Sequence, residues 1–97
     1  MINQITYTQL KDWEQKAEPF MLIDVREAWE HHAFNIGGKL LPFSEFSIAD
    51  YPKESAIPIV IYCAKGIRSM IVLQRLCEQI DGSNFYNLTG GISKLTT

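Results

Sequence analysis

One uninterrupted apolar segment constrains the fold of this chain more than any other feature. Residues 57–62 read Ile-Pro-Ile-Val-Ile-Tyr. A run of this length and character is typical of a β-strand that is buried on both faces, as in the middle of a parallel sheet. The short segment 63–68 follows, and a helical pattern begins at Ser69. This succession of strand, loop and helix predicts an α/β domain.

The rest of the chain repeats the alternation of short apolar segments with helical patterns. Ninety-seven residues without a repeat or a linker predict one domain, residues 1–97. We expect a five-stranded, mostly parallel sheet with helices on both faces. The expected strands are residues 5–7, 20–24, 39–41, 57–62 and 85–87, and the expected helices are residues 8–17, capped by Thr8, then 27–32, 44–48 and 69–80.

Composition excludes several classes of function. A net charge of −2 and a pI near 5.6 argue against a nucleic-acid binder, which would present a basic surface. The apolar segments are too short to span a membrane, and the first residues lack the pattern of a signal peptide, so we expect a cytoplasmic protein that binds no membrane. The two histidines, His31 and His32, have no partner at metal-ligand spacing, and we expect both at the surface.

Cys63 is the strongest candidate for a catalytic residue. It follows the buried strand and precedes a helix, where backbone N–H groups and the helix dipole favour an anion. Lys65 and Arg68 add positive charge nearby, and cysteines in such surroundings ionise readily to nucleophilic thiolates. Cys77 falls on the apolar stripe of the same helix, so we expect it to be buried and reduced rather than part of the site.

The spacing between Cys63 and Arg68 limits the size of the anion. Four residues separate them, and Gly66 among these can adopt a positive φ that turns successive amides inward. Phosphatases use a loop that is one residue longer and encloses a tetrahedral phosphate. The shorter loop suits a smaller anion, such as the terminal sulfur of a persulfide.

Several motifs, in the same order along the chain, resemble those of the rhodanese family of sulfurtransferases. They are Asp24-Val25-Arg26-Glu27 with Glu30, Asn35-Ile36-Gly37-Gly38 with Pro42, Ile61-Tyr62-Cys63 with Gly66, Arg68 and Ser69, and Tyr86-Asn87-Leu88 with Gly90-Gly91. The resemblance implies the strand order 1-5-4-2-3, which brings Asp24 and Cys63 to one edge of the sheet, with Gly90-Gly91 reaching the same edge.

The resemblance also implies a reaction. Cys63 would take the outer sulfur of thiosulfate, a polysulfide or a protein persulfide and pass it to a thiol or an acceptor protein, without a metal or an organic cofactor. The backbone amides of the loop would hold the outer sulfur. These substrate-binding positions are Ala64, Lys65, Gly66, Ile67, Arg68 and Ser69.

The sequence leaves the roles of the charged residues open. Arg68 either contacts the donor or braces the loop, and Ser69 is first of all a residue of the helix start. We expect Asp24 to accept hydrogen bonds from the next turn rather than to act as a base, and Arg26 to support that turn by pairing with Glu30. Trp13 and Trp29 fit packing of helices on the sheet, although Trp29 is also a candidate for the mouth of the site.

Two departures from the family pattern bear on the substrate. The segment Phe34-Asn35-Ile36-Gly37-Gly38-Lys39 is similar to that of rhodanese domains attached to E1-like adenylyltransferases, which suggests a protein partner. Ala64 stands where many active members carry a polar residue, which favours a persulfide donor over thiosulfate. We expect a monomer. The alternatives are a non-catalytic docking module and, against the loop length, a cysteine phosphatase or an arsenate reductase.

Overall fold

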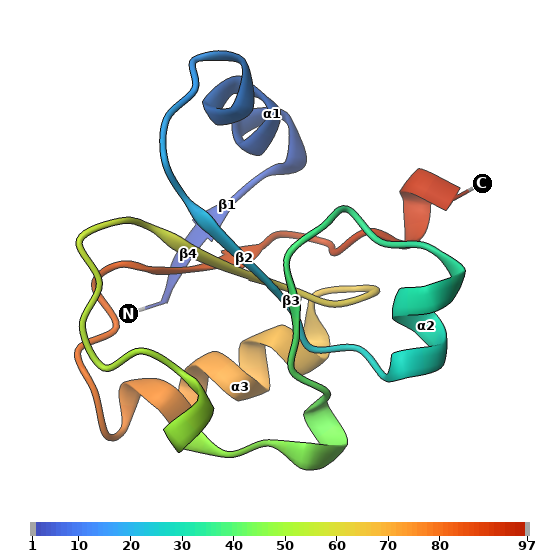
Figure 1. Cartoon of the computed structure of the whole chain (residues 1–97). Helices are drawn as coiled ribbons and strands as arrows, with labels where there is room; N and C mark the ends of the chain where they lie inside the picture. Colours follow the sequence, from blue (N-terminus) through green and yellow to red (C-terminus); the bar gives the residue numbers. More distant parts are fainter. Residues whose placement is uncertain (1, 97) are drawn as a thin grey trace.

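The computed structural model describes residues 2–96 and contains one five-stranded sheet with helices on both faces (Figure 1). The strands are β1 (Asn3–Ile5), β2 (Met21–Asp24), β3 (Lys39–Leu40), β4 (Ile59–Tyr62) and β5 (Phe85–Leu88). The α-helices are α1 (Tyr7–Gln15), α2 (Ala28–Ala33) and α3 (Ile67–Cys77), and three short 3-10 turns are η1 (Phe43–Glu45), η2 (Ile48–Asp50) and η3 (Ser93–Thr96).

The strand order is β1-β5-β4-β2-β3, and every pair is parallel, which confirms the predicted topology. The central strand β4 lies between β2 and β5. Asp24 is opposite Tyr62 in the register, so β2 and β4 end side by side. The residues that follow these strands therefore meet at one edge of the sheet, where ligands of open parallel sheets bind.

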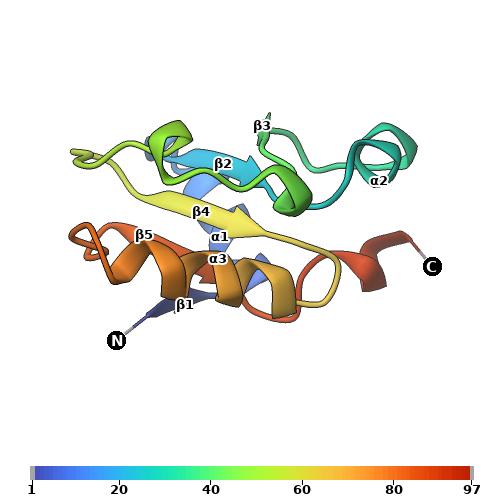
Figure 2. The ribbon, with the colours of Figure 1, turned by 90° about the horizontal axis from the view of Figure 1, so that it is seen from below.

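Two apolar cores lie on opposite faces of the sheet. Successive residues of β4 alternate between them, because neighbouring side chains of a strand point to opposite faces. Ile59, Ile61 and Cys63 pack in the core under α3, whereas Val60 and Tyr62 pack in the core under α1. In Figure 2 α3 covers the near face of the sheet, and the loop after β4 lies at the same end of the molecule as α2 and the C-terminal turn.

The helix boundaries differ from the prediction for local reasons. Thr6, not Thr8, caps α1, because its hydroxyl accepts from the Gln9 amide while the Gln9 side chain accepts from the Thr6 amide. Helix α3 begins two residues before Ser69, directly after Gly66. It ends at Cys77, which is exposed, so the prediction that Cys77 is buried was wrong. None of the helices within residues 2–96 is long and apolar enough to cross a membrane.

Candidate active site

Cys63 follows β4, and its sulfur lies within a set of hydrogen-bond donors. The backbone N–H groups of Gly66 and Ser69 donate to Sγ over 3.1 and 3.4 Å. Both cysteines are free thiols, and no disulfide occupies this sulfur. Donors that converge on one sulfur stabilise negative charge on it, so the surroundings of Cys63 suit a thiolate.

The start of α3 produces this convergence. Gly66 has φ +90°, a conformation that strongly favours glycine, and it directly precedes the helix. The first amides of a helix have no intrahelical acceptor and carry the positive end of the helix dipole. The first helical turn contains Ile67, Arg68 and Ser69. The sequence pattern had assigned Ile67 and Arg68 to the loop.

Ser69 is closer to the nucleophile than the sequence suggested. Its Oγ lies 3.3 Å from the sulfur of Cys63, and the residue is fully buried. Ser69 lies in the first turn of α3, as expected, and its hydroxyl also faces the sulfur, which was the less favoured of the two roles. The hydroxyl also donates to Oδ1 of Asn87 over 2.5 Å.

The segment after β5 supports the loop from behind. The amide of Ile92 donates to the Cys63 carbonyl over 3.1 Å, and the amide of Ser93 donates to the Ala64 carbonyl over 2.8 Å. Gly91 lies so close to these two carbonyls that a Cβ atom there would overlap them. The double glycine therefore reaches the edge that holds Cys63 and brings a second backbone segment against the loop.

Two adjoining cavities open at this edge. A cavity of about 320 Å³ is lined by Cys63, Ala64, Lys65, Ile67 and Arg68. Cys63 is only 1% exposed, and this cavity is the opening that it helps to line. A second cavity of about 360 Å³ shares Ala64 with the first, and its other lining residues are Arg26, Trp29, Glu30, Ala33, Phe34, Ile92 and Ser93.

Arg68 is held by an acidic partner on α2. Its Nη1 and Nη2 donate to Oε1 and Oε2 of Glu30 over 2.7 and 2.9 Å. The hydrogen bonds from Arg68 outweigh burial and lower the pKa of Glu30 to about 2. Glu30 in turn raises the pKa of Arg68. In this structure Arg68 braces the loop, and the predicted pairing of Arg26 with Glu30 was wrong.

Arg26 pairs instead with Asp24. The guanidinium Nε and Nη2 donate to the Asp24 carboxylate at 2.8–3.2 Å, and the Arg26 amide donates to Oδ1 over 2.9 Å. Burial opposes ionisation of Asp24, but hydrogen bonds from Arg26 and His31 outweigh it and lower the pKa of the carboxyl. A buried carboxylate held in this way supports the turn after β2, in keeping with the role expected for Asp24.

Two further expectations need correction. His31 is not a simple surface residue, because its Nδ1 lies 2.8 Å from Oδ2 of Asp24 and most of its side chain is covered. His32 is exposed as expected.

Trp29 does not pack on the sheet: it is 74% exposed and lines the second cavity, whereas Trp13 packs against Phe20 and Tyr86. Across residues 2–96 no group of three or more His, Cys, Asp or Glu side chains is placed to hold a metal ion.

Sequence reasoning missed two residues that contact the site through others. Glu30 was assigned to the wrong arginine, because i to i+4 spacing on a helix says nothing about a partner on a distant element. Asn87 received no role. Its signal was an amide inside an otherwise apolar strand, since a buried polar side chain needs a hydrogen-bond partner.

Comparison with known proteins identifies the domain family. The family model for the rhodanese-like domain matches residues 6–97. The adenylyltransferase and sulfurtransferase MOCS3-1 of Drosophila pseudoobscura pseudoobscura is 28% identical over 91% of this chain, which spans only 22% of that relative. A crystal structure from Staphylococcus saprophyticus subsp. saprophyticus has 27% identity and a TM-score of 0.79, covering 96% of this chain and 92% of its own. The human single-domain sulfurtransferase TSTD1, at 21% identity, shares the fold with a TM-score of 0.75 over 100% and 98% of the two chains. This chain belongs to the rhodanese-like domain family.

Proposed function

We propose that this chain is a sulfurtransferase that carries a sulfane sulfur as a persulfide on Cys63. The observation that carries the proposal is the convergence of the Gly66 and Ser69 amides on Sγ, at the floor of an open cavity. Such preorganised donors stabilise negative charge where the reaction needs it. The four-residue spacing to Arg68 leaves room for one added sulfur rather than for a phosphate.

In the first half-reaction the Cys63 thiolate attacks the outer sulfur of the donor. A Cys63 Sγ–S bond forms, and the bond between the outer sulfur and the rest of the donor breaks. The leaving group takes that electron pair and departs as sulfite from thiosulfate, as a shortened polysulfide, or as the thiolate of a protein persulfide. The negative charge stays on the outer sulfur, near the amides of residues 64–69.

In the second half-reaction an acceptor thiolate attacks the outer sulfur. The new S–S bond belongs to the acceptor, and Cys63 leaves as a thiolate, ready for another cycle. Because each half-reaction passes one neutral sulfur atom from one sulfur nucleophile to another, with no net oxidation or reduction, we expect no metal or organic cofactor. The Asp24 carboxylate is hydrogen-bonded to Arg26 and His31. A thiolate nucleophile needs no general base, so we assign Asp24 no proton transfer.

We expect a persulfide to be a better donor than thiosulfate. Ala64 offers no polar side chain at the cavity, and the carboxylate of Glu30 occupies the two terminal guanidinium nitrogens of Arg68, which would otherwise be available to a sulfonate. A doubly charged donor therefore meets a negative group in place of an unpaired arginine. Lys65, which is exposed on the loop, is left as the cation that attracts anions.

We expect the donor or the acceptor to be a protein. Trp29 and Ile67 are exposed and each lines one of the two cavities that share Ala64, and Phe34 adds apolar surface to the cavity of Trp29. Large apolar residues at the mouth of a site suit contact with a partner polypeptide. The curated relative named above combines a sulfurtransferase with an adenylyltransferase in one chain, which gives this expectation a precedent.

Intact-mass spectrometry after exposure to polysulfide tests the carrier. The proposal expects a gain of about 32 Da, one sulfur atom, on the peptide that contains Cys63. Cys63→Ser should lose this gain, and Cys77→Ser is the matched control that should keep it. If wild-type protein never gains sulfur on Cys63, the carrier function is refuted.

A turnover assay separates the alternative functions. Sulfur release to cyanide is measured with thiosulfate, polysulfide and cysteine persulfide as donors, for the wild-type protein and for Cys63→Ser. Release that depends on Cys63 supports the sulfurtransferase. Equal release by both proteins favours a docking module, and Cys63-dependent hydrolysis of an aryl phosphate without sulfur release favours a phosphatase.

A further inference from the structure

Asn87 is a buried amide whose hydrogen bonds lead from the nucleophile to the protein surface. It lies on β5 and is only 3% exposed. Its Oδ1 accepts from Ser69 Oγ over 2.5 Å, and its Nδ2 donates to Gln4 Oε1 over 2.9 Å. Ser69 Oγ lies 3.3 Å from the sulfur of Cys63. Four side chains thus form one continuous chain of contacts across β1, β5 and the start of α3.

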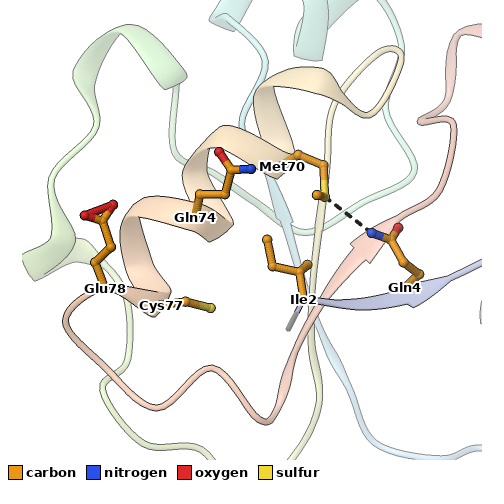
Figure 3. Close-up of a pocket in the computed structure, with 6 residues that line it drawn as sticks. All are labelled: Ile2, Gln4, Met70, Gln74, Cys77 and Glu78. Carbon is orange, nitrogen blue, oxygen red and sulfur yellow. Dashed lines mark hydrogen bonds between the residues drawn. The ribbon is translucent and has the colours of Figure 1, made fainter.

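The contacts of Gln4 fix which way the Asn87 amide points. Gln4 Oε1 also accepts from the hydroxyl of Thr89 over 3.0 Å, and Gln4 Nε2 points to Sδ of Met70 at 3.3 Å (Figure 3). Gln4 therefore presents an acceptor to Asn87, and Asn87 turns its NH2 group toward Gln4. This leaves Oδ1, which can only accept, facing Ser69.

The Ser69 hydroxyl has one hydrogen and two candidate acceptors. While it donates to Asn87, its oxygen offers a lone pair to Cys63 and can accept from a neutral S–H group. A Cys63 thiolate has no hydrogen to donate and gains most from a hydroxyl that donates to it. Asn87 and the thiolate therefore compete for the same hydrogen.

We propose that Asn87 is a positioning residue that holds the Ser69 hydroxyl hydrogen and so withholds it from the sulfur of Cys63. On ionisation the Cys63 proton leaves through the cavity to solvent, and the Ser69 hydroxyl rotates from Oδ1 of Asn87 toward the sulfur. The importance of this role for catalysis rests on the proposed function. The competition between Asn87 and Cys63 for the Ser69 hydrogen does not, because it concerns the free protein.

The charged groups around Cys63 are the same whether Asn87 is present or replaced. Lys65 lies on the loop, Arg68 on the first turn of α3, and Glu30 on α2 is bound to Arg68. At the end of β2, Asp24 is paired with Arg26 and His31. The side chain that β5 itself directs to Ser69 is the neutral amide of Asn87. A neutral replacement of Asn87 therefore isolates the effect of the hydroxyl.

The test is the pH dependence of iodoacetamide alkylation of Cys63 in the free protein, read by peptide mass spectrometry in a Cys77→Ser background. Asn87→Leu keeps the branch at Cγ, although the side chain is larger, and removes the acceptor, so the Ser69 hydroxyl is free to donate to the thiolate. We expect the midpoint of alkylation to move down by about one pH unit, a roughly tenfold change in ionisation. An unchanged or higher midpoint overturns the proposal.

Ser69→Ala provides the decisive control. In that background there is no hydroxyl to release, so Asn87→Leu should leave the midpoint unmoved. An equal downward shift with and without Ser69 would mean that Asn87 acts by some other route, and would overturn the inference.

Gln4→Leu serves if Asn87→Leu does not fold, because Gln4 is exposed on β1. It removes the hydrogen-bond partner of Asn87 Nδ2 and lets the Asn87 amide turn, so we expect a smaller shift of the midpoint in the same direction. A midpoint that does not move would contradict the proposed role of Asn87. Since alkylation needs no sulfur donor, a protein that fails to accept sulfur but shows these shifts refutes the proposed function alone. A protein that transfers sulfur normally but shows no shift in the alkylation midpoint refutes only the proposed role of Asn87.

Discussion

The two nitrogens at the end of the Arg68 side chain donate to the two carboxylate oxygens of Glu30, across 38 residues of sequence. This two-pronged ion pair joins the first turn of α3 to α2 and closes one side of the loop that holds Cys63. The pair is only partly exposed, so solvent screens it less than a surface salt bridge. Arg68 therefore helps to shape the loop. While it is paired with Glu30, its two terminal nitrogens are not available to a sulfur donor.

Glu30→Gln should loosen the loop and widen the choice of donor. The variant leaves the guanidinium of Arg68 without a charged partner, so we expect a loss of about 1–3 kcal/mol in the free energy of unfolding. It also removes a negative charge beside the cavity, so the ratio of kcat/KM for thiosulfate to that for cysteine persulfide should rise about threefold or more. Urea unfolding and the cyanide assay measure the two effects.

Glu45→Gln is the matched control for this variant, because Glu45 is exposed in η1, away from the cavities. It should change neither stability nor donor preference. The rise for thiosulfate should shrink as salt is added, since salt screens charge. A donor ratio that stays at the wild-type value in Glu30→Gln would show that the carboxylate does not disfavour thiosulfate.

Acid should destabilise the fold partly through the same pair. The pKa of Glu30 falls from an ordinary 4.5 to about 2 in the folded protein, chiefly because of the hydrogen bonds from Arg68. The unfolded chain thus takes up a proton more readily, and protonation favours unfolding. The contribution of Glu30 is complete above about pH 4.5 and is lost as the pH falls toward 2.

Asp24 adds to this loss, because its pKa is also lowered on folding. Urea unfolding at a series of pH values should therefore show a fall in stability below about pH 4.5, and a shallower fall in Glu30→Gln. Parallel curves for the two proteins would contradict the contribution of Glu30.

The order of elements and the position of the nucleophile were accessible from sequence because they depend on local patterns. The apolar residues of β4 and the glycine before α3 can each be recognised from a few neighbouring residues. The family motifs supply the strand order. Boundaries were less accurate. Residues 57–58 were assigned to the central strand although it begins at Ile59, since apolar character alone does not mark where pairing to a neighbouring strand starts.

Contacts between distant side chains were the part that sequence could not give. The spacing of Arg26 and Glu30 suggested a local pair, yet each finds a better partner elsewhere: Arg26 turns back to the buried Asp24, and Glu30 reaches Arg68. The hydrogen bonds from Ser69 through Asn87 to Gln4 likewise join distant residues: the register of β1 and β5 brings Gln4 to Asn87, and α3 brings Ser69 to Asn87. These contacts depend on tertiary geometry rather than on local pattern.

Asp24→Asn should damage stability far more than chemistry. The change leaves the guanidinium of Arg26, which is 5% exposed, without its negative partner. Breaking one side of such a buried pair costs about 3–5 kcal/mol. We expect chemical denaturation to show a loss of this size, whereas the rate of Cys63 alkylation by iodoacetamide in the folded protein should stay within about threefold of wild type.

Asp50→Asn, at an exposed position of η2, is the control that should be neutral in both measurements. If Asp24→Asn instead slowed sulfur transfer a hundredfold or so while the protein stayed folded and stable, Asp24 would have to be a catalytic base rather than a support for the turn.

Gly91→Ala and Gly90→Ala should differ sharply, although the two glycines are adjacent and both have positive φ, +66° and +76°. Either alanine carries the strain of that conformation, about 1–2 kcal/mol. A Cβ at Gly90 meets nothing within 4 Å, whereas a Cβ at Gly91 would overlap the carbonyl oxygens of Cys63 and Ala64. Only Gly91→Ala therefore has to push the loop away from its backbone support.

We expect Gly90→Ala to lose the strain energy alone in thermal unfolding and to keep sulfur transfer near wild type. Gly91→Ala should lose several kcal/mol more, or leave a folded protein in which Cys63 gains sulfur at least tenfold more slowly. The comparison isolates the position of the loop, because the backbone conformation required of both residues is nearly the same. Equal behaviour of the two variants would mean that contact with Gly91 does not position Cys63.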